Sequence, residues 1–444
     1  MGAKRRRSRN RAPYCTCVDP TPPPVCCNTA AKLKLAKELA ISAPTAIPPE
    51  TRWRGVATGL LIGVVAAMHI GKLPPAIPAL RQEFGLTLAQ SGWIVSAFNT
   101  LGLFASIFMG FATARLGAWR QCVWGMACMA GGGLVGAVAP DAVWLIVSRF
   151  LEGVGFLSTV VAAPGLILQS ATPTDQRRAF SFWGGYMPTG TTIGMLLAPG
   201  VIAALGWRAL WLAEVLCALA AVALLVWQRE ALAAPARSDA PHWKEAAQPL
   251  LRPGPWWIAF AFACYVFNFY SIMVWLPTFL VGERQTPLAL ASVLTAVVVL
   301  ANLPGNVLGG WLMQRGASRG TNVCLAGLAT LVTASVVFSP QFSDGLRYAA
   351  CVAFSFSVGV MPGSIMSAAQ THARTPQQAG IVQGMINQGT NVGQFISPFV
   401  VSAVVGVGLA WDRMRALFWV SAVLIVMCGL VIRHIERQIQ AGRR

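Results

Sequence analysis

Apolar stretches of about twenty residues recur along the chain, separated by short polar or charged segments. A helix of that length crosses the hydrocarbon core of a bilayer, which is about 30 Å thick. No stretch alternates like a barrel strand, and lipid cannot satisfy a free backbone amide. We therefore predict an all-α membrane protein with twelve transmembrane helices, with approximate cores at Gly55–Ile77, Gly92–Phe111, Val123–Val138, Val143–Ile167, Phe180–Leu205, Leu210–Val226, Trp257–Val281, Leu290–Met313, Val323–Phe338, Ala349–Ala369, Gly380–Val405 and Ala416–Ile432.

The longest polar segment between two predicted helices separates the first six helices from the second six. It is rich in proline, as is typical of a linker between domains. We predict a disordered, basic, Pro- and Cys-rich cytoplasmic tail (1–54), a first six-helix bundle (55–227), a cytoplasmic linker (228–255), a second six-helix bundle (256–433) and a cytoplasmic C-terminal tail (434–444).

The two halves repeat an unusual spacing. Gly190-Thr-Thr-Ile-Gly194 with Pro199 is matched by Gly389-Thr-Asn-Val-Gly393 with Pro398. Repeats in the same order are typical of transporters whose binding site lies between the halves, near the middle of the bilayer. Because G-x-x-x-G spacing lets two helix backbones approach closely, we expect these glycines to meet across the two halves.

Composition and charge support a membrane protein and predict its orientation. Of the 444 residues, 55% are hydrophobic and 11% are charged, against about 25% charged in soluble domains. The formal net charge is +19, but most Lys and Arg lie in the predicted tails and in the loops on the same side. This distribution follows the positive-inside rule and argues against nucleic-acid binding. We predict a multi-pass protein of the plasma or inner membrane with both termini cytoplasmic.

The eleven cysteines predict no disulfide framework. Most lie in or beside apolar spans, where free Cys behaves as a small hydrophobe. Cys15, Cys17, Cys26 and Cys27 cluster in the N-terminal tail, a spacing that could bind a metal, but no His lies near them. We expect no metal site and no cofactor.

Two matched segments and one helix carry a family signature. Gly110, Arg115, Gly117 and Arg120 resemble the Gly-x-x-x-Asp-Arg-x-Gly-x-Arg-Arg signature of the major facilitator superfamily, with Ala114 in place of Asp. A second copy carries Gly310 and Arg315, with Gln314 in place of Asp. Arg149-Phe-Leu-Glu152-Gly153-Val-Gly155 is similar to the fourth-helix signature Arg-x-x-Gln-Gly-x-Gly of the same family, with Glu in place of Gln.

The resemblance covers roughly residues 54–433 and implies a fold of two six-helix bundles and transport by alternating access. We expect a monomer without enzymatic activity, and gating or packing roles for Gly110, Arg115, Gly117, Gly190, Gly194, Gly310, Arg315, Gly389 and Gly393. The first two spans also look similar to the cyanate and nitroimidazole transporter branch. Met195 replaces a signature proline in the fifth helix, so the antiporter label attached to that motif is not carried over.

Ionisable residues inside a bilayer are costly, and each is therefore a candidate functional residue. His69 and Lys72 lie three residues apart in the first span. They precede Leu73-Pro74-Pro75, where we expect the helix to kink. We predict that Lys72 attracts an anionic substrate and that His69 is its neighbour and a candidate proton carrier. The alternative is that the Lys72 side chain extends to the outer surface.

Two more ionisable groups share the fourth span. Arg149 and Glu152 are also three residues apart and can form an ion pair within one helix. That pair is either structural or couples substrate binding to proton uptake, as the resemblance implies for the Arg. For Glu214 in the sixth span, we expect a structural pair with Arg208.

Uncharged polar residues recur at helical spacing in the second half. We predict that Gln383, Asn387 and Asn391 line a water-filled cavity, since four amides on one face, with Gln394, need partners that lipid does not offer. Interhelical hydrogen bonding is the alternative for all such stripes. The remaining predicted substrate-binding residues are Asn99, Tyr186, Asn268 and Asn302.

These features predict a secondary active transporter of a small organic or inorganic anion, with protons as the candidate coupling ion. Its expected partners are membrane lipid and the small-molecule substrate. Proton-driven multidrug efflux is the alternative. The sequence lacks an HExxH motif and paired catalytic carboxylates, which argues against an intramembrane enzyme, and nothing resembles a channel filter.

Overall fold

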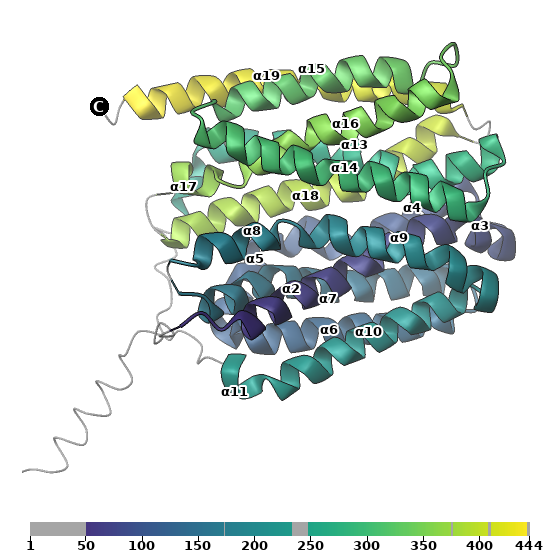
Figure 1. The fold of residues 1–444 in the computed structure, drawn as a ribbon, viewed down its shortest axis with the longest axis horizontal. Coiled ribbons are helices and arrows are strands. Elements are labelled where there is room, and N and C mark those ends of the chain that lie inside the picture. Colours follow the sequence, from purple (N-terminus) through teal and green to yellow (C-terminus); the bar gives the residue numbers. More distant parts are fainter. Residues whose placement is uncertain (1–49, 173, 233–246, 374–375, 407–409, 442–444) are drawn as a thin grey trace, which may run out of the picture. The chain divides into compact units, whose positions relative to one another are not determined.

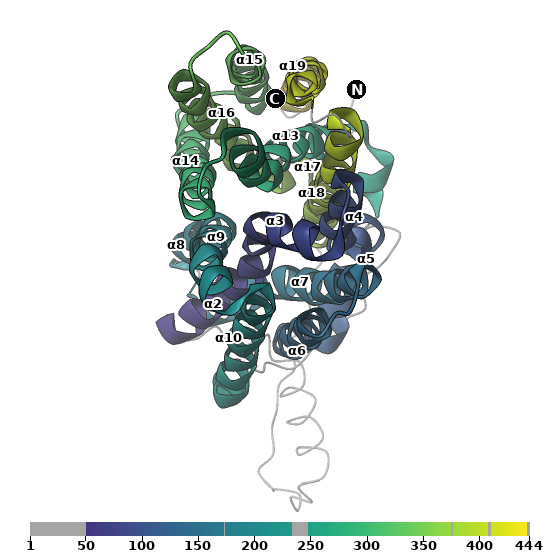
Figure 2. The same cartoon turned by 90° about the vertical axis from the view of Figure 1, so that its right-hand side faces the viewer.

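The computed structural model describes residues 50–172, 174–232, 247–373, 376–406 and 410–441. Most of the predicted N-terminal tail and part of the predicted linker, including the four tail cysteines, therefore lie outside the described residues. Within the described ranges the ordered elements are helices. Figures 1 and 2 show them as two groups, α2 to α10 and α13 to α19, and in the end-on view of Figure 2 the groups lie side by side.

The first bundle contains the first six predicted spans, of which three are interrupted. Its main helices are α2 (Trp53–Gly71) with α3 (Leu73–Phe84), α4 (Leu88–Ala97) with α5 (Thr100–Leu116), α6 (Ala118–Ala137), α7 (Ala142–Ser170), α8 (Gln176–Trp183) with α9 (Tyr186–Leu205), and α10 (Trp207–Trp227), followed by the short α11 (Arg229–Leu232).

The second bundle contains the other six spans as longer, mostly continuous helices. They are α13 (Pro253–Arg284), α14 (Leu288–Gln314), α15 (Arg319–Val337), α16 (Asp344–Ile365), α18 (Pro376–Val405) and α19 (Met414–Ala441), with the shorter η1 (Gln248–Leu251), α17 (Ala368–His372) and η2 (Trp411–Arg413) between them. Together the two bundles confirm the predicted twelve-helix architecture.

Nine of the described helices are long and apolar enough by themselves to cross a membrane. The other three predicted spans depart from that rule for visible reasons. The second span breaks at Phe98–Asn99, α6 is rich in glycine, and α18 carries the amide-rich face. Helix length and hydropathy alone therefore do not identify these three predicted spans.

Local sequence accounts for where several helices start. Thr87 and Gln90 form a capping box at the start of α4, and the Asp141 carboxylate accepts hydrogen bonds from two backbone N–H groups at the start of α7. Gly117 joins α5 to α6 with φ of 82°, a backbone conformation that strongly favours glycine. The retained glycine of the family-like signature thus has a local structural role.

The two bundles repeat the same packing. In the first, α2 packs on α9, and α6 packs on α7 and α10. In the second, α13 packs on α18, and α15 packs on α16 and α19. The bundles meet where α4 and α5 contact α18, where α9 contacts α14, and where α3 contacts α13. The repeated glycine motif in the sequence therefore reflects a repeated arrangement of helices.

The repeated glycines pack within each bundle, so the expectation that they meet across the two halves was wrong. A Cβ at Gly190 would overlap the carbonyl oxygen of Val64 on α2, and one at Gly389 would overlap that of Ala259 on α13. Gly194 and Gly393 lie one turn further along the same two contacts. The close approach joins the first and fifth helix of each half, because those helices cross near their small residues.

We expect Gly190→Ala to destabilise the protein, because the added Cβ would push α2 and α9 apart. Overpacking of this kind costs about 1–3 kcal/mol. Gly200→Ala is the matched control in the same helix, since no atom lies within 4 Å of a Cβ at that position. Thermal unfolding of the purified variants measures the difference. Equal unfolding temperatures for the two variants would contradict a tight α2–α9 contact.

Candidate charged site within the first bundle

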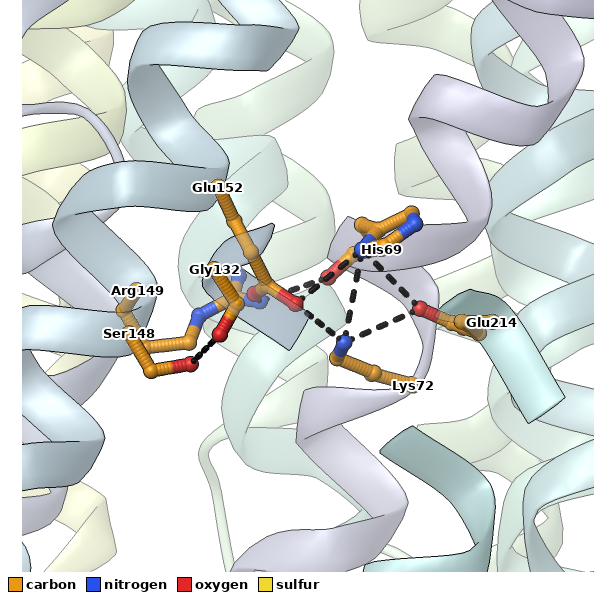
Figure 3. Close-up of polar contacts among 7 residues, drawn as sticks. All are labelled: His69, Lys72, Gly132, Ser148, Arg149, Glu152 and Glu214. Atoms are coloured by element: carbon orange, nitrogen blue, oxygen red, sulfur yellow. Dashed lines mark hydrogen bonds and ion pairs between the residues drawn. The ribbon is translucent and has the colours of Figure 1, made fainter. Parts of the chain in front are cut away.

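Five ionisable side chains from three helices meet inside the first bundle. His69 lies near the end of α2, Lys72 follows it, Arg149 and Glu152 lie on α7, and Glu214 lies on α10. Their exposed fractions range from 0% to 2%, so this charge cluster is sealed from solvent (Figure 3). The Lys72 side chain therefore does not extend to the membrane surface, and that alternative was wrong.

Lys72 bridges two carboxylates that belong to different helices. Its Nζ lies 2.6 Å from Oε1 of Glu152 and 3.1 Å from Oε2 of Glu214. Its Nζ also lies 4.5 Å from the centre of the Trp211 ring, a cation–π contact that adds to the stabilisation of the ammonium group. The cation thus ties α2 to both α7 and α10.

Glu152 is the centre of the cluster. Besides Lys72, it contacts Nδ1 of His69 at 3.1 Å and forms an ion pair with Arg149 one turn earlier on α7. The structure therefore contains the Arg149–Glu152 pair that the sequence predicts. Arg149 also donates to the backbone carbonyl of His69 at 2.9 Å, and its guanidinium lies 4.3 Å from the centre of the Phe98 ring.

Formal charges in the cluster balance when His69 is neutral. Lys72 and Arg149 carry two positive charges, and Glu152 and Glu214 carry two negative charges. A net charge in a bilayer interior is expensive, whereas a balanced and hydrogen-bonded set is tolerated. Adding a proton or an anion alone would break this balance, and adding both would restore it.

The expected pair of Glu214 with Arg208 was wrong. Arg208 pairs instead with Glu83 at 2.6 Å, where both side chains are more than a third exposed, while Glu214 turns inward to Lys72. Positions six apart on a helix are separated by about 240° around its axis, because each residue advances about 100°. Glu214 is the cluster member whose role sequence reasoning missed, and this angular separation was the available signal.

Asn99 lies next to the cluster, in the interruption between α4 and α5. It is 1% exposed and has backbone angles outside the helical region. Among the described residues, neither its side-chain oxygen nor its side-chain nitrogen has a hydrogen-bond partner, although both atoms are buried. Because α4 and α5 contact α18, the predicted residue Asn99 lies where the charge cluster meets the second bundle.

The amide face of α18 lies partly along the contact between the bundles. Asn391 donates to the hydroxyl of Ser106 on α5 at 2.9 Å, and a Cβ at Gly102 would overlap the Asn391 side chain. Gln383 and Asn387 are half-buried and interact with each other at 3.4 Å. This face touches the first bundle, but among the described residues no hydrogen bond or ion pair joins it to Lys72.

The structure does not bring Asn268, Asn302 and Tyr186 to the charge cluster. Asn268 donates to Ser421 on α19 at 2.9 Å, and Asn302 joins Tyr265 to the backbone of α16, so both make interhelical hydrogen bonds within the second bundle. Tyr186 stacks on Trp183 with ring centres 4.1 Å apart. Substrate contact by these three residues remains a prediction.

The signature loops differ from what their motifs suggest. Arg115 and Arg315 are exposed, and Arg315 lies 4.2 Å above the Trp311 ring. A close helix approach at Gly310 was expected, but a Cβ there would meet no atom within 4 Å; the contact forms one residue earlier, at Gly309, which faces Val360. Gly110 lies in α5, and its surroundings are outside the described residues.

Comparisons with known proteins agree with this architecture. The family model described as Major Facilitator Superfamily matches residues 59–398. A probable sulfoacetate transporter of Cupriavidus necator is 26% identical over 395 residues, covering 77% of this chain and 86% of that protein. A methylenomycin A resistance protein of Streptomyces coelicolor is 27% identical over 169 residues, covering 37% of this chain and 34% of that protein.

One solved structure extends the similarity to the fold. A bacterial homologue of the human lysosomal transporter Spinster, in an inward-facing and unoccupied conformation, aligns with a TM-score of 0.69 at 13% identity. The alignment covers 88% of this chain and 98% of that chain. At this identity the similarity supports the fold and carries no information on the substrate.

Proposed function

The chain belongs to the major facilitator superfamily, and we propose that it transports a small organic anion by alternating access with protons as the coupling ion. The observation that carries the proposal is the balanced, buried charge cluster around Glu152. The proposed orientation has both termini in the cytoplasm, as the distribution of Lys and Arg predicts.

Charge balance supplies the coupling in this proposal. When Glu152 takes up a proton, it becomes neutral, and Lys72 and Arg149 are left with one carboxylate, Glu214. The cluster then carries one excess positive charge, which an entering carboxylate neutralises. Either the proton or the anion alone leaves a net charge in the bilayer interior, which costs free energy. The two therefore bind together.

The interruption between α4 and α5 gives the substrate a route to the cluster. Phe98 covers the Arg149 guanidinium, and Asn99 beside it is buried between α4 and α5, the helices that contact α18 of the second bundle. We propose that movement of this segment uncovers Arg149 to the path between the bundles. Irregular backbone at membrane depth is tolerated where it lines such a path.

Support for an anionic substrate also comes from the sulfoacetate transporter, which aligns over most of both chains. Sulfoacetate carries a carboxylate and a sulfonate. A dianion would need two protons for balance, and His69, in contact with both carboxylates, is the second group that could take one. The resistance protein favours drug efflux as the second candidate, although its alignment covers little more than a third of this chain.

Uptake into proteoliposomes tests the proposal. We expect an inward proton gradient to drive accumulation of a labelled monocarboxylate or sulfoacetate, because each negative charge enters with one proton. A potassium diffusion potential imposed with valinomycin should leave monocarboxylate uptake unchanged, since the loaded cluster is neutral. Accumulation that follows the membrane potential and ignores the proton gradient would contradict this coupling, and extrusion of methylenomycin would favour efflux.

A further inference from the structure

A cavity lies inside the second bundle, away from the charge cluster. It has a volume of about 360 Å³, within the range of about 300–1,000 Å³ typical of ligand sites. It is lined by the second half of α13, the first turns of α14 and α16, the end of α15, and η2 with the start of α19. Its apolar wall includes Leu276, Phe279, Leu294, Phe338, Trp411 and Met414.

One end of this cavity carries an excess of positive charge. Arg284 and Arg347 share a single oxygen of Asp344, at 3.1 and 3.3 Å, and both guanidinium groups lie within 5.7 Å of the Phe279 ring centre. Asp344 and Arg284 are the exposed members of this group. Because two cations face one carboxylate, the open end has room for one more negative charge.

Two tryptophans of the cavity lining carry hydrogen-bond donors that have no partner among the described residues. The indole nitrogen of Trp275 is buried and unbonded, and this side chain is 1% exposed. Trp411, whose ring packs against that of Phe279 with centres 5.6 Å apart, also has a buried indole nitrogen without a partner among the described residues. A buried donor without a partner costs free energy, which a ligand acceptor in the cavity would recover.

We propose that this cavity binds an amphipathic monocarboxylate with an acceptor oxygen in its apolar body. The carboxylate contacts Arg284 and Arg347, the body fills the aromatic chamber, and the acceptor oxygen receives the indole N–H of Trp275. Such an acid can come from solution, as an aryl ether acid, or from the membrane, as an oxygenated fatty acid. This inference is independent of the proposed function, because the cavity and the charge cluster lie in different bundles.

Calorimetric titration of the protein in nanodiscs with three matched compounds tests the site. The compounds are 4-phenoxybutyrate, 5-phenylpentanoate, which replaces the ether oxygen by CH₂, and 4-phenoxybutanol, which lacks the charge. We expect the first to bind about tenfold more tightly than either of the others, as one hydrogen bond or one charge contact would produce. A 12-hydroxydodecanoate arm distinguishes a lipid-derived ligand from an aromatic one.

Variants connect the binding to the cavity. Arg284→Gln should weaken 4-phenoxybutyrate about tenfold and leave the alcohol unchanged, and Trp275→Phe should remove the preference for the ether oxygen. Leu294→Trp fills the chamber and should abolish binding. Glu83→Gln, in the exposed ion pair with Arg208 of the other bundle, should leave it unchanged. Binding that survives Leu294→Trp in the folded variant, or absence of binding by all four compounds, would overturn the proposal.

Discussion

Lys72→Met is expected to abolish uptake and to lower the stability of the protein by about 3–5 kcal/mol, the range measured when one partner of a buried ion pair is removed. Lys72 is 0% exposed and forms ion pairs with the carboxylates of Glu152 on α7 and Glu214 on α10. Met has a similar length and no charge, so it leaves two buried carboxylates facing one Arg. The measurements are thermal unfolding and proteoliposome uptake.

The double variant Lys72→Met/Glu214→Gln separates folding from transport. It removes one charge of each sign, so the cluster is again balanced, and we expect much of the lost stability to return while uptake stays absent. Arg208→Gln is the control for a charge pair at the surface, because the exposed Arg208–Glu83 pair contributes at most about 1 kcal/mol. Uptake by Lys72→Met at the wild-type rate would refute a role for Lys72 in anion binding.

The sequence was sufficient for contacts that lie within one helix or follow from hydrophobic length. The twelve spans and the Arg149–Glu152 pair, one turn apart, are of this kind. Contacts between helices were not accessible, since periodicity says which residues share a face and not which helix that face meets. For this reason the sequence identified Lys72, Glu152 and Glu214 as separate candidates, but did not predict that Lys72 pairs with the two carboxylates.

Glycine spacing shows the same limit from another side. The repeated motif correctly indicates close backbone contacts, but Gly190 and Gly389 use them to hold neighbouring helices of the same bundle. A moving contact between the bundles and a fixed contact within one have the same sequence signature. The structure places the motif within each bundle, and other residues meet between the bundles, among them Ser96 on α4, which donates to the Phe395 carbonyl on α18 at 2.7 Å.

The corresponding helix contacts of the two bundles carry different chemistry. Where α2 meets α10, Lys72 forms an ion pair with Glu214; where α13 meets α19, Asn268 forms a hydrogen bond with Ser421. Packing is repeated, but charge is found at this contact in the first bundle alone. In the proposed mechanism the contact of α2 with α10 therefore takes part in proton and anion uptake. The buried ion pair of the second bundle, Arg319 with Glu436, lies at a different contact, between α15 and α19.

Glu152→Gln is expected to uncouple transport from protons. Gln has nearly the same shape and cannot ionise, so Lys72 and Arg149 face only Glu214 at every pH, as they would in the protonated wild type. Accumulation driven by a proton gradient should disappear, while exchange of labelled for unlabelled anion across the membrane should persist. Counterflow and gradient-driven uptake in the same vesicles measure the two activities.

Binding gives an independent test of the same variant. The permanent excess positive charge should make the anion stabilise Glu152→Gln more than it stabilises the wild type at neutral pH, as a larger rise in unfolding temperature. Glu83→Gln is the matched control, because Glu83 lies in the exposed pair with Arg208 and should change neither coupling nor binding. If Glu152→Gln still accumulates the anion along a proton gradient, Glu152 does not carry the coupled proton. That role would then pass to Glu214 or His69, the other titratable groups in contact with Lys72.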